Sequence, residues 1–409
     1  MKKLSTCARV ATVCGLVAAL LGCGGGSSSS APAVPNSVTI GQLGGTYGAV
    51  GQSVTVNWSN TQNVACSGSG ALTGALAASG SQTVTLTTEG ITTFTVTCGY
   101  ASKSTTNQTL PQYTAVADPV FEQALVTMGV DDVVDGKVST AAILKVTKMA
   151  ILGGQGYQTA AGVQTAATGN AFITSTTGLE NFRNLTYLRF EQQKVAAIDL
   201  SALSELTYIS LWQLPITSLD LSHNTALKTV GLSETALTSV DLSALPSLTD
   251  LEIQANEALV GAVYTVANGT TVVGFSSLDV THNPKLTTIL AFGNHVTSLD
   301  LSNNPLLTNA GFAYNRLISV NVTGDRALDA LAVDHNQLTS LDIASTSIGQ
   351  ISGPQSLNAK GNAGLTSVVV TNAAQMTTWC SNAVTAIANN SGAYGVCAID
   401  STTTFVSGS

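Results

Sequence analysis

The chain has 409 residues, of which 9% are charged and 44% are hydrophobic, and its formal net charge is −8. A soluble domain usually carries about 25% charged residues, so this chain is unusually neutral. The sparse charge excludes a nucleic-acid-binding protein, which needs a dense basic surface, and a disordered acidic tail, which needs many like charges.

The N-terminus has the pattern of a secretory signal peptide over residues 1–22, with three basic residues before an apolar run too short to span a membrane. The run ends in LLGC at residues 20–23, which resembles the lipobox of bacterial lipoproteins. The resemblance implies acylation of Cys23, and Gly24 in place of Asp implies an outer-membrane location, with exposure at the cell surface or in the periplasm as the two alternatives. The alternative is an ordinary secretory signal with a chance Cys. A Gly/Ser tether follows, so residues 23–36 form anchor and linker.

The cysteine count supports export. Of the seven cysteines, two lie in the signal peptide and Cys23 is the proposed lipid site, which leaves four. These four form two local pairs, 32 and 17 residues apart, which are Cys66 with Cys98 and Cys380 with Cys397. An even set in an exported chain predicts two disulfides, and the domain boundaries favour the local pairing among three possible ones. A metal site is not favoured, because there is no C-x-x-C and no His near either pair.

Residues 37–115 alternate apolar and polar side chains in short runs separated by Gly and Asn, which is typical of strands with one buried face. The run GQSVTVNW, ending at Trp58, together with Cys66 and Cys98, resembles a bacterial immunoglobulin-like β-sandwich. Trp58 precedes the first Cys instead of following it, so the bridge need not join two sheets. A passive spacer is favoured over an adhesive domain.

A repeat follows this domain. Segments of the form L-x-x-L-x-L start at intervals of 21, 21, 21, 38, 21 and 21 residues, at Leu185, Leu206, Leu227, Leu248, Leu286, Leu307 and Leu328. An Asn follows three residues after the last apolar position of four turns, at Asn256, Asn294, Asn315 and Asn336. This is the leucine-rich repeat signature, whose turns bury their apolar faces only by stacking. The Asn side chains are predicted to bond backbone groups of neighbouring turns.

A second apolar motif, such as ITSLDLS at residues 216–222, recurs in the same phase and predicts an extended piece on both sides of each turn. Together with DPVFEQAL at residues 118–125, the pattern is similar to internalin-type surface proteins of bacteria. The resemblance implies a mainly β fold, with parallel strands and short capping helices. It implies an N-terminal cap and first repeat over residues 116–184, a solenoid over 185–375 and a C-terminal disulfide cap over 376–409.

Two insertions interrupt the pattern. Residues 259–274 alternate around Asn268-Gly269 and predict a hairpin that projects from the middle of the array, either shaping a binding site or forming a tolerated loop. Residues 153–170 are rich in Gly, Ala and Thr and predict a loop.

Catalytic motifs are missing from the sequence, so we expect no enzymatic activity, no cofactor and no metal. The four His occupy turn positions, and the acidic turn around Asp131 departs from a calcium-binding loop. A column of Asp side chains recurs in the second motif, at Asp199, Asp220, Asp241 and Asp300, and is interpreted as solvated strand positions that bond nearby Ser or Thr.

The repeat frame predicts which side chains point outward from the strands. Those proposed to bind a ligand are Tyr187, Arg189, Tyr208, Trp212, Asp250, Glu252, Phe292 and Tyr314. So long a ladder, on a concave face, suits a protein or polysaccharide at the cell surface better than a metabolite, and exposed Tyr and Trp anchor many interfaces. The alternative for these aromatics is packing under an insertion. The alternative function is a structural envelope protein that associates with itself or with cell-wall polymer.

Overall fold

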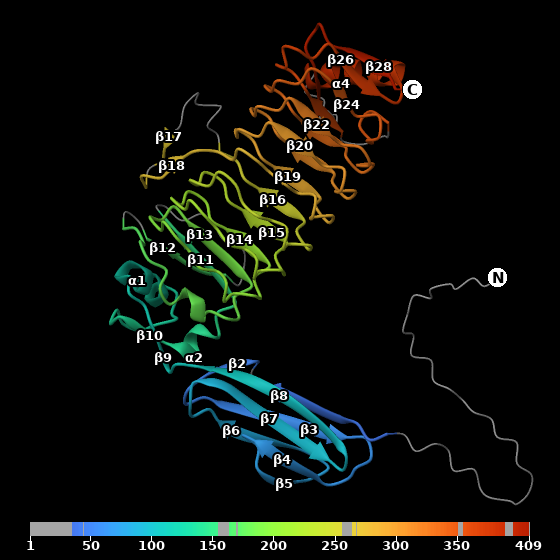
Figure 1. Ribbon diagram of the computed structural model, residues 1–409. Helices are drawn as coiled ribbons and strands as arrows, with labels where there is room; N and C mark the ends of the chain where they lie inside the picture. Colours follow the sequence, from blue (N-terminus) through green and yellow to red (C-terminus); the bar gives the residue numbers. More distant parts are fainter. Residues whose placement is uncertain are drawn as a thin grey trace, which may run out of the picture.

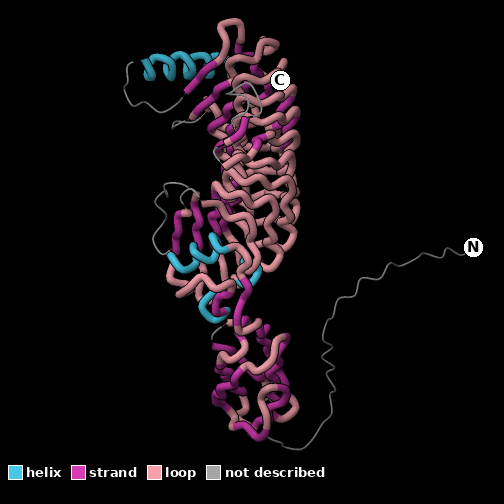
Figure 2. Tube along the Cα trace, turned by 90° about the vertical axis from the view of Figure 1, so that its left-hand side faces the viewer, coloured by secondary structure: helices cyan, strands magenta, loops and turns pink. Residues whose placement is uncertain are grey.

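The chain folds into two parts that lie end to end, an N-terminal pair of sheets and a long solenoid (Figures 1 and 2). The computed structural model describes residues 35–43, 45–153, 163–168, 171–255, 264–266, 268–350, 355–388 and 396–408. Within these ranges, no helix is both long enough and apolar enough to cross a membrane. The expected lipid site, Cys23, lies outside the described residues, as does the signal segment.

The N-terminal part consists of two sheets with strand orders β1-β3-β6 and β2-β8-β7-β4-β5. Period-2 alternation places Val56 and Trp58 of β3 in one core with Phe94 and Val96 of β7. The strands are β1 (Val38–Leu43), β2 (Tyr47–Ala49), β3 (Ser53–Asn60), β4 (Cys66–Gly70), β5 (Gly74–Leu76), β6 (Ser79–Thr85), β7 (Gly90–Cys98) and β8 (Ala101–Leu110).

A disulfide joins Cys66 and Cys98, which face each other directly in the register of β4 and β7, with Cα atoms 4.1 Å apart. The bridge therefore links neighbouring strands of one sheet. In antibody domains the bridge crosses between the two sheets and packs against a Trp that follows the first Cys. The early position of Trp58 in the sequence had already indicated this departure.

A compact cap closes the first end of the solenoid. It contains β9 (Tyr113–Ala115), α1 (Pro119–Thr127), β10 (Lys137–Ser139) and α2 (Thr140–Ile143). Asp118 caps α1 by accepting the backbone N–H groups of Val120 and Phe121. The buried Glu122 accepts the N–H groups of residues 135–137, so the acidic turn is held by a carboxylate from α1. Within the described ranges, no cluster of three His, Cys, Asp or Glu side chains could hold a metal ion.

The solenoid is built on one parallel sheet with the order β12-β11-β13-β14-β15-β16-β19-β21-β23-β25-β27. Successive turns pair in the register predicted by the 21-residue repeat, as in Tyr208 opposite Thr229. The strands are β11 (Lys148–Leu152), β12 (Gln164–Ala167), β13 (Tyr187–Glu191), β14 (Tyr208–Ser210), β15 (Thr229–Gly231), β16 (Asp250–Glu252), β19 (Thr288–Leu290), β21 (Asn309–Gly311), β23 (Ala330–Ala332), β25 (Ser356–Asn358) and β27 (Val396–Ala398), with a 3-10 turn η1 (Leu179–Asn181).

The sheet is longer than the seven strands of the repeat pattern, because both ends add strands. The prediction of a loop for residues 153–170 was wrong for β12, which pairs in parallel with β11. The rest of that insertion, residues 154–162 and 169–170, lies outside the described residues. At the other end β25 and β27 extend the ladder. Added edge strands of this kind continue the backbone pairing of the repeats.

The second motif forms strands only in the later turns, so the prediction of two extended pieces in every turn was too broad. Its strands are β20 (Ser298–Asp300), β22 (Ser319–Asn321), β24 (Leu341–Asp342), β26 (Ser367–Val370) and β28 (Thr404–Ser407). In early and late turns alike, the Asp of this motif accepts a local backbone bond, as Asp300 and Asp342 do in the strand-forming turns. Oδ1 of Asp199, Asp220 and Asp241 each accepts the backbone N–H group of the Ser two residues ahead. Bonds to a nearby Ser were expected from the interpretation of these Asp as solvated positions.

Two ladders of buried amides run along the solenoid. The first confirms the prediction: Asn315 Nδ2 donates to Ala291 O at 2.8 Å and to Phe312 O at 3.1 Å. Equivalent bonds are made by Asn294, Asn336 and Asn362, while Asn256 lies outside the described residues. The second ladder was not predicted from the sequence: buried amides at Asn224, Asn283 and Asn304 donate to carbonyls of the preceding turn.

The hairpin of the long insertion is present as β17 (Tyr264–Thr265) and β18 (Thr271–Val272), which pair antiparallel. It does not project freely as predicted. Its tip residue Asn268 is buried and donates to Gln193 O at 2.8 Å and to Gln213 O at 2.5 Å. The hairpin therefore folds back onto the turns that carry Gln193 and Gln213. In the second of these turns, Leu214 stands where later turns carry the Asn of the first ladder, so this turn has no amide there.

Helix α4 (Ala373–Ala388) closes the far end of the solenoid (Figure 1). The predicted disulfide between Cys380 and Cys397 ties this helix to β27, with Cα atoms 5.0 Å apart. The C-terminal segment is thus both a cap and the last turn of the ladder.

Candidate functional site

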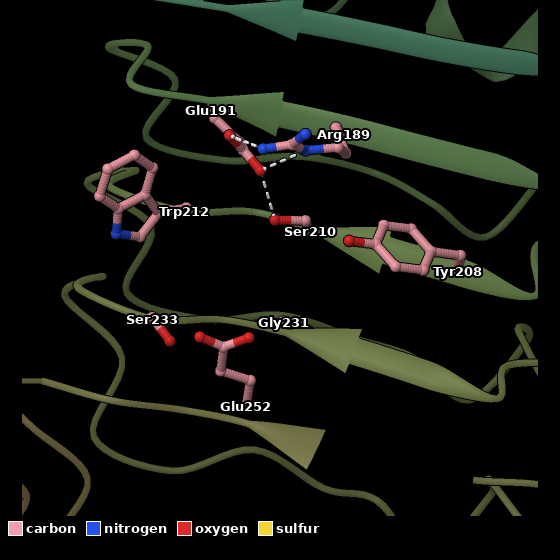
Figure 3. Close-up of a pocket in the computed structure, with 8 residues that line it drawn as sticks. All are labelled: Arg189, Glu191, Tyr208, Ser210, Trp212, Gly231, Ser233 and Glu252. Carbon is pink, nitrogen blue, oxygen red and sulfur yellow. Dashed lines mark hydrogen bonds and ion pairs between the residues drawn. The ribbon is translucent and has the colours of Figure 1, made fainter. Parts of the chain in front are cut away.

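The outer face of the eleven-stranded sheet carries the side chains that the repeat frame predicted to point outward. Along one turn, Tyr208, Ser210 and Trp212 alternate with Ile209 and Leu211, which are buried. This period-2 pattern places the first three side chains on the same face (Figure 3).

A depression of about 200 Å³ opens on this face. Four of its lining residues were among the predicted ligand-binding residues. The eight residues are Arg189, Glu191, Tyr208, Ser210, Trp212, Gly231, Ser233 and Glu252, from β13, β14, β15, β16 and the residues that follow them. Gly231 lies across the floor in Figure 3, where β15 has no side chain to fill the space between Tyr208, Trp212 and Glu252. The hollow therefore lies where Ser210, Gly231 and Ser233 place small residues among Tyr208, Trp212 and Glu252.

A charged network forms the upper wall of the depression. The guanidinium of Arg189 makes two 2.8 Å bonds to the carboxylate of Glu191, and Ser210 Oγ donates to Glu191 Oε1 at 2.6 Å. The hydrogen bonds to Glu191, followed by its negative charge, raise the pKa of Arg189 against the opposing effect of burial. The opposite charges of Arg189 and Glu191 cancel, and the buried Glu191 carboxylate is hydrogen-bonded by both Arg189 and Ser210.

Aromatic side chains form the two ends of the depression. The ring of Tyr208 stacks on Tyr187 of the preceding turn, with centroids 4.3 Å apart and planes 11° apart. Burial, followed by the neighbouring Tyr187, raises the pKa of Tyr208 to about 12. At the other end Trp212 Nε1 donates to Glu234 Oε2 at 3.2 Å. Both anchors are half-buried and held in place.

A column of residues with left-handed backbone conformation borders the Trp212 end of the depression. Gln192, Gln213 and Glu234 follow successive turns with φ of 57°, 53° and 56°. Their side chains are linked, because Gln192 Nε2 donates to Gln213 Oε1 and Gln213 Nε2 donates to Glu234 Oε2. Since Glu234 also accepts from the Trp212 indole, the column orients Trp212.

Four predicted residues do not line the depression: Tyr187, which stacks on Tyr208, and three residues further along the sheet. Asp250 accepts a bond from Thr249, and the ring of Phe292, in the turn next to that of Glu252, covers Gly311 of the following turn. Tyr314 stacks on His335 at 4.2 Å. The predicted aromatic residues thus form an early group, Tyr187, Tyr208 and Trp212, and a late group, Phe292 and Tyr314, on either side of the turn that carries Asp250 and Glu252.

Sequence reasoning missed the small and buried members of the site. Glu191, Ser210, Gly231 and Ser233 line the depression but were not among the residues proposed to bind. Glu191 and Ser233 are in fact only 2% and 8% exposed. The available signal was the run of small residues Ser210, Gly231 and Ser233 between aromatic neighbours, which marks a hollow.

No protein-family model matches the chain, and no curated protein matches it significantly. The functional domain of InlJ from Listeria monocytogenes is similar in structure, with 21% identity over 63% of this chain and a TM-score of 0.37. The match spans 57% of the InlJ chain, which is less than two thirds of it. The internalin InlF from Listeria monocytogenes has 16% identity, covering 62% of this chain and 88% of that one, with a TM-score of 0.30.

A plant ice-binding protein is also similar, with 18% identity, coverage of 45% of this chain and 70% of that one, and a TM-score of 0.27. All three are distant structural matches. The fold is established by the chain itself, through its parallel ladder, its 21-residue register and its buried Asn side chains. The chain contains a leucine-rich repeat domain, preceded by an N-terminal region of mainly antiparallel sheets.

Proposed function

We propose that this chain is a non-enzymatic recognition or adhesion protein of the bacterial cell envelope, anchored by lipid on Cys23 in the outer membrane. Its ligand is a protein or a glycan that docks on the outer face of the eleven-stranded sheet. The observation that carries this proposal is the depression between Tyr208 and Trp212, with its fixed aromatic walls and polar lining. Solenoids present extended surfaces of this kind for binding. The N-terminal sheets, proposed as an immunoglobulin-like spacer, hold the solenoid away from the anchor.

The binding face can be tested with a double substitution. Beads coated with the chain are incubated with envelope fractions and intact cells, and retention is measured. Tyr208→Ala combined with Trp212→Ala is expected to reduce binding at least tenfold, because truncated aromatic anchors cost about 2 kcal/mol or more each. The matched control is Tyr100→Ala with Tyr113→Ala, two exposed tyrosines away from this face, which should leave retention unchanged. Equal retention by a correctly folded Tyr208/Trp212 variant would contradict the proposal.

The anchor is tested separately. Metabolic labelling with a radioactive fatty acid is expected to mark the wild-type chain, and Cys23→Ala should abolish the label. Cys7→Ala, which alters a Cys inside the expected signal segment, serves as the control and should retain it. Labelling that persists in Cys23→Ala would overturn the lipid site.

Protease treatment of intact cells separates the two envelope functions. A surface recognition protein is digested, whereas a structural protein that faces the periplasm is protected until the outer membrane is opened.

A further inference from the structure

We propose that the depression receives a basic side chain, Arg or Lys, of a protein ligand; this inference rests on the proposed binding face. The inference rests on one juxtaposition: the exposed carboxylate of Glu252 lies beside the floor of the depression at Gly231, which the rings of Tyr208 and Trp212 flank. In Figure 3 the Glu252 carboxylate reaches across the floor at Gly231 toward Ser233. A cation placed there would meet a negative charge and aromatic faces together.

The charges that line the depression favour a cation. Arg189 is the single cation among the eight lining residues, and both of its bonds go to Glu191. That pair is neutral, so the remaining charge is the carboxylate of Glu252. Glu252 is exposed, and its Oε1 accepts a 2.9 Å bond from Gln254 Nε2. An incoming ammonium or guanidinium group can bond the same carboxylate without breaking the Arg189–Glu191 pair.

The walls supply the second attraction. A cation over the face of Trp or Tyr is attracted by the ring quadrupole, and Trp is the better partner. Tyr208 is stacked on Tyr187, and the indole N–H of Trp212 is bonded to Glu234, so both rings are positioned before a ligand arrives. Pre-positioned rings reduce the ordering cost of binding.

A neutral glycan fits the lining less well. Sugars are held by several hydrogen-bond donors and acceptors around their hydroxyl groups. In this depression the Ser210 and Ser233 hydroxyls are already hydrogen-bonded within the protein. Ser210 Oγ donates to Glu191, and Ser233 Oγ accepts the N–H of Gln254. The volume of about 200 Å³ also suits a single side chain better than a chain of sugar rings.

The test uses the indole signals of the three Trp residues in the full, isotope-labelled chain, measured by NMR. The probe is the peptide acetyl-Gly-Arg-Gly-amide. Its analogue with citrulline, which has the same shape without the charge, is the matched ligand control. We expect the arginine peptide to shift the Trp212 signal saturably and leave Trp58 and Trp379 unmoved. The citrulline peptide is expected to bind at least tenfold more weakly.

A variant pair isolates the carboxylate. Glu252→Gln is expected to weaken binding of the arginine peptide about threefold to tenfold, which matches a loss of exposed charge pairing. Glu205→Gln removes the same charge from an exposed turn outside the depression and should leave the affinity unchanged. Equal affinities for the arginine and citrulline peptides, or an unchanged affinity in Glu252→Gln, would overturn the inference.

A third probe separates this inference from the proposed function. If maltohexaose shifts the Trp212 signal and the arginine peptide does not, the basic-side-chain inference fails while the binding face stands. If no probe shifts Trp212, the inference also fails, and the fate of the binding face is then decided by the envelope retention of the Tyr208/Trp212 double variant.

Discussion

Asp325→Asn is expected to stabilise the solenoid at pH 8, by up to about 4 kcal/mol. Asp325 is fully buried, and neither of its carboxylate oxygens has a hydrogen-bond partner. Burial, followed by the charge of Asp300, raises its pKa to about 7. A difference of about three pH units from an unfolded Asp corresponds to the stated free energy.

The repeat explains why Asn is the better residue. Asp325 stands where earlier turns of the second amide ladder carry Asn283 and Asn304. Asn304 Nδ2 donates to Val280 O at 3.0 Å and to Asn283 O at 2.9 Å. The same offsets place the carbonyls of Leu301 and Asn304 beside Asp325. A carboxylate offers these carbonyls no donor, whereas an amide offers two N–H groups.

The pH dependence follows from the raised pKa. Between about pH 4 and pH 7 the folded chain holds a proton on Asp325 that the unfolded chain has released. The stability contributed by the neutral carboxyl is therefore complete below pH 4 and is lost as the pH rises to about 7. The advantage of Asp325→Asn should grow over this interval and level off above it.

Urea unfolding midpoints at pH 5 and pH 8 measure this effect. Asp241→Asn is the matched control, because Asp241 is exposed and its pKa is lowered by the Ser243 hydroxyl and N–H group. It removes one negative charge from an exposed position of the second motif and leaves the buried Asp325 carboxylate in place. It should therefore not increase the free energy of unfolding at pH 8. An Asp325→Asn variant no more stable than wild type at pH 8 would contradict the argument.

The sequence predicted the periodic parts of this fold well, because stacking imposes them. The spacing of Leu185, Leu206 and Leu227 predicts strands in register, and β13, β14 and β15 are paired that way. The Asn ladder followed from the same spacing. The ends were harder to predict, because β12 and β27 come from segments without the repeat pattern and owe their place to pairing with their neighbours.

The site was only partly predictable. Outward direction follows from period-2 alternation, which placed Tyr208 and Trp212 on the correct face. Depth depends on neighbouring turns: Gly231 creates a hollow below these rings, whereas Phe292 fills the space over Gly311. The fold of the hairpin tip onto Gln193 and Gln213 was also unpredictable, since no local pattern links Asn268 to residues more than 50 positions away.

Asn315→Ala is expected to destabilise the solenoid by about 2–4 kcal/mol, because it leaves buried backbone groups without partners. The side chain of Asn315 donates to Ala291 O and Phe312 O and accepts the N–H of Val296 at 3.1 Å. These groups belong to two turns, so the amide holds the turns together as well as filling space. Urea unfolding at pH 7 measures the loss.

Asn309→Ala is the matched control for this prediction, since Asn309 lies on the exposed face of the same turn. It should change the free energy of unfolding by less than about 0.5 kcal/mol. If the two variants are equally stable, the buried Asn ladder does not hold adjacent turns together.

Asn268→Ala applies the same test to the first turns, where the hairpin supplies an amide beside Leu214. A loss there would show that an inserted segment stabilises a turn that carries Leu214 in place of the ladder amide.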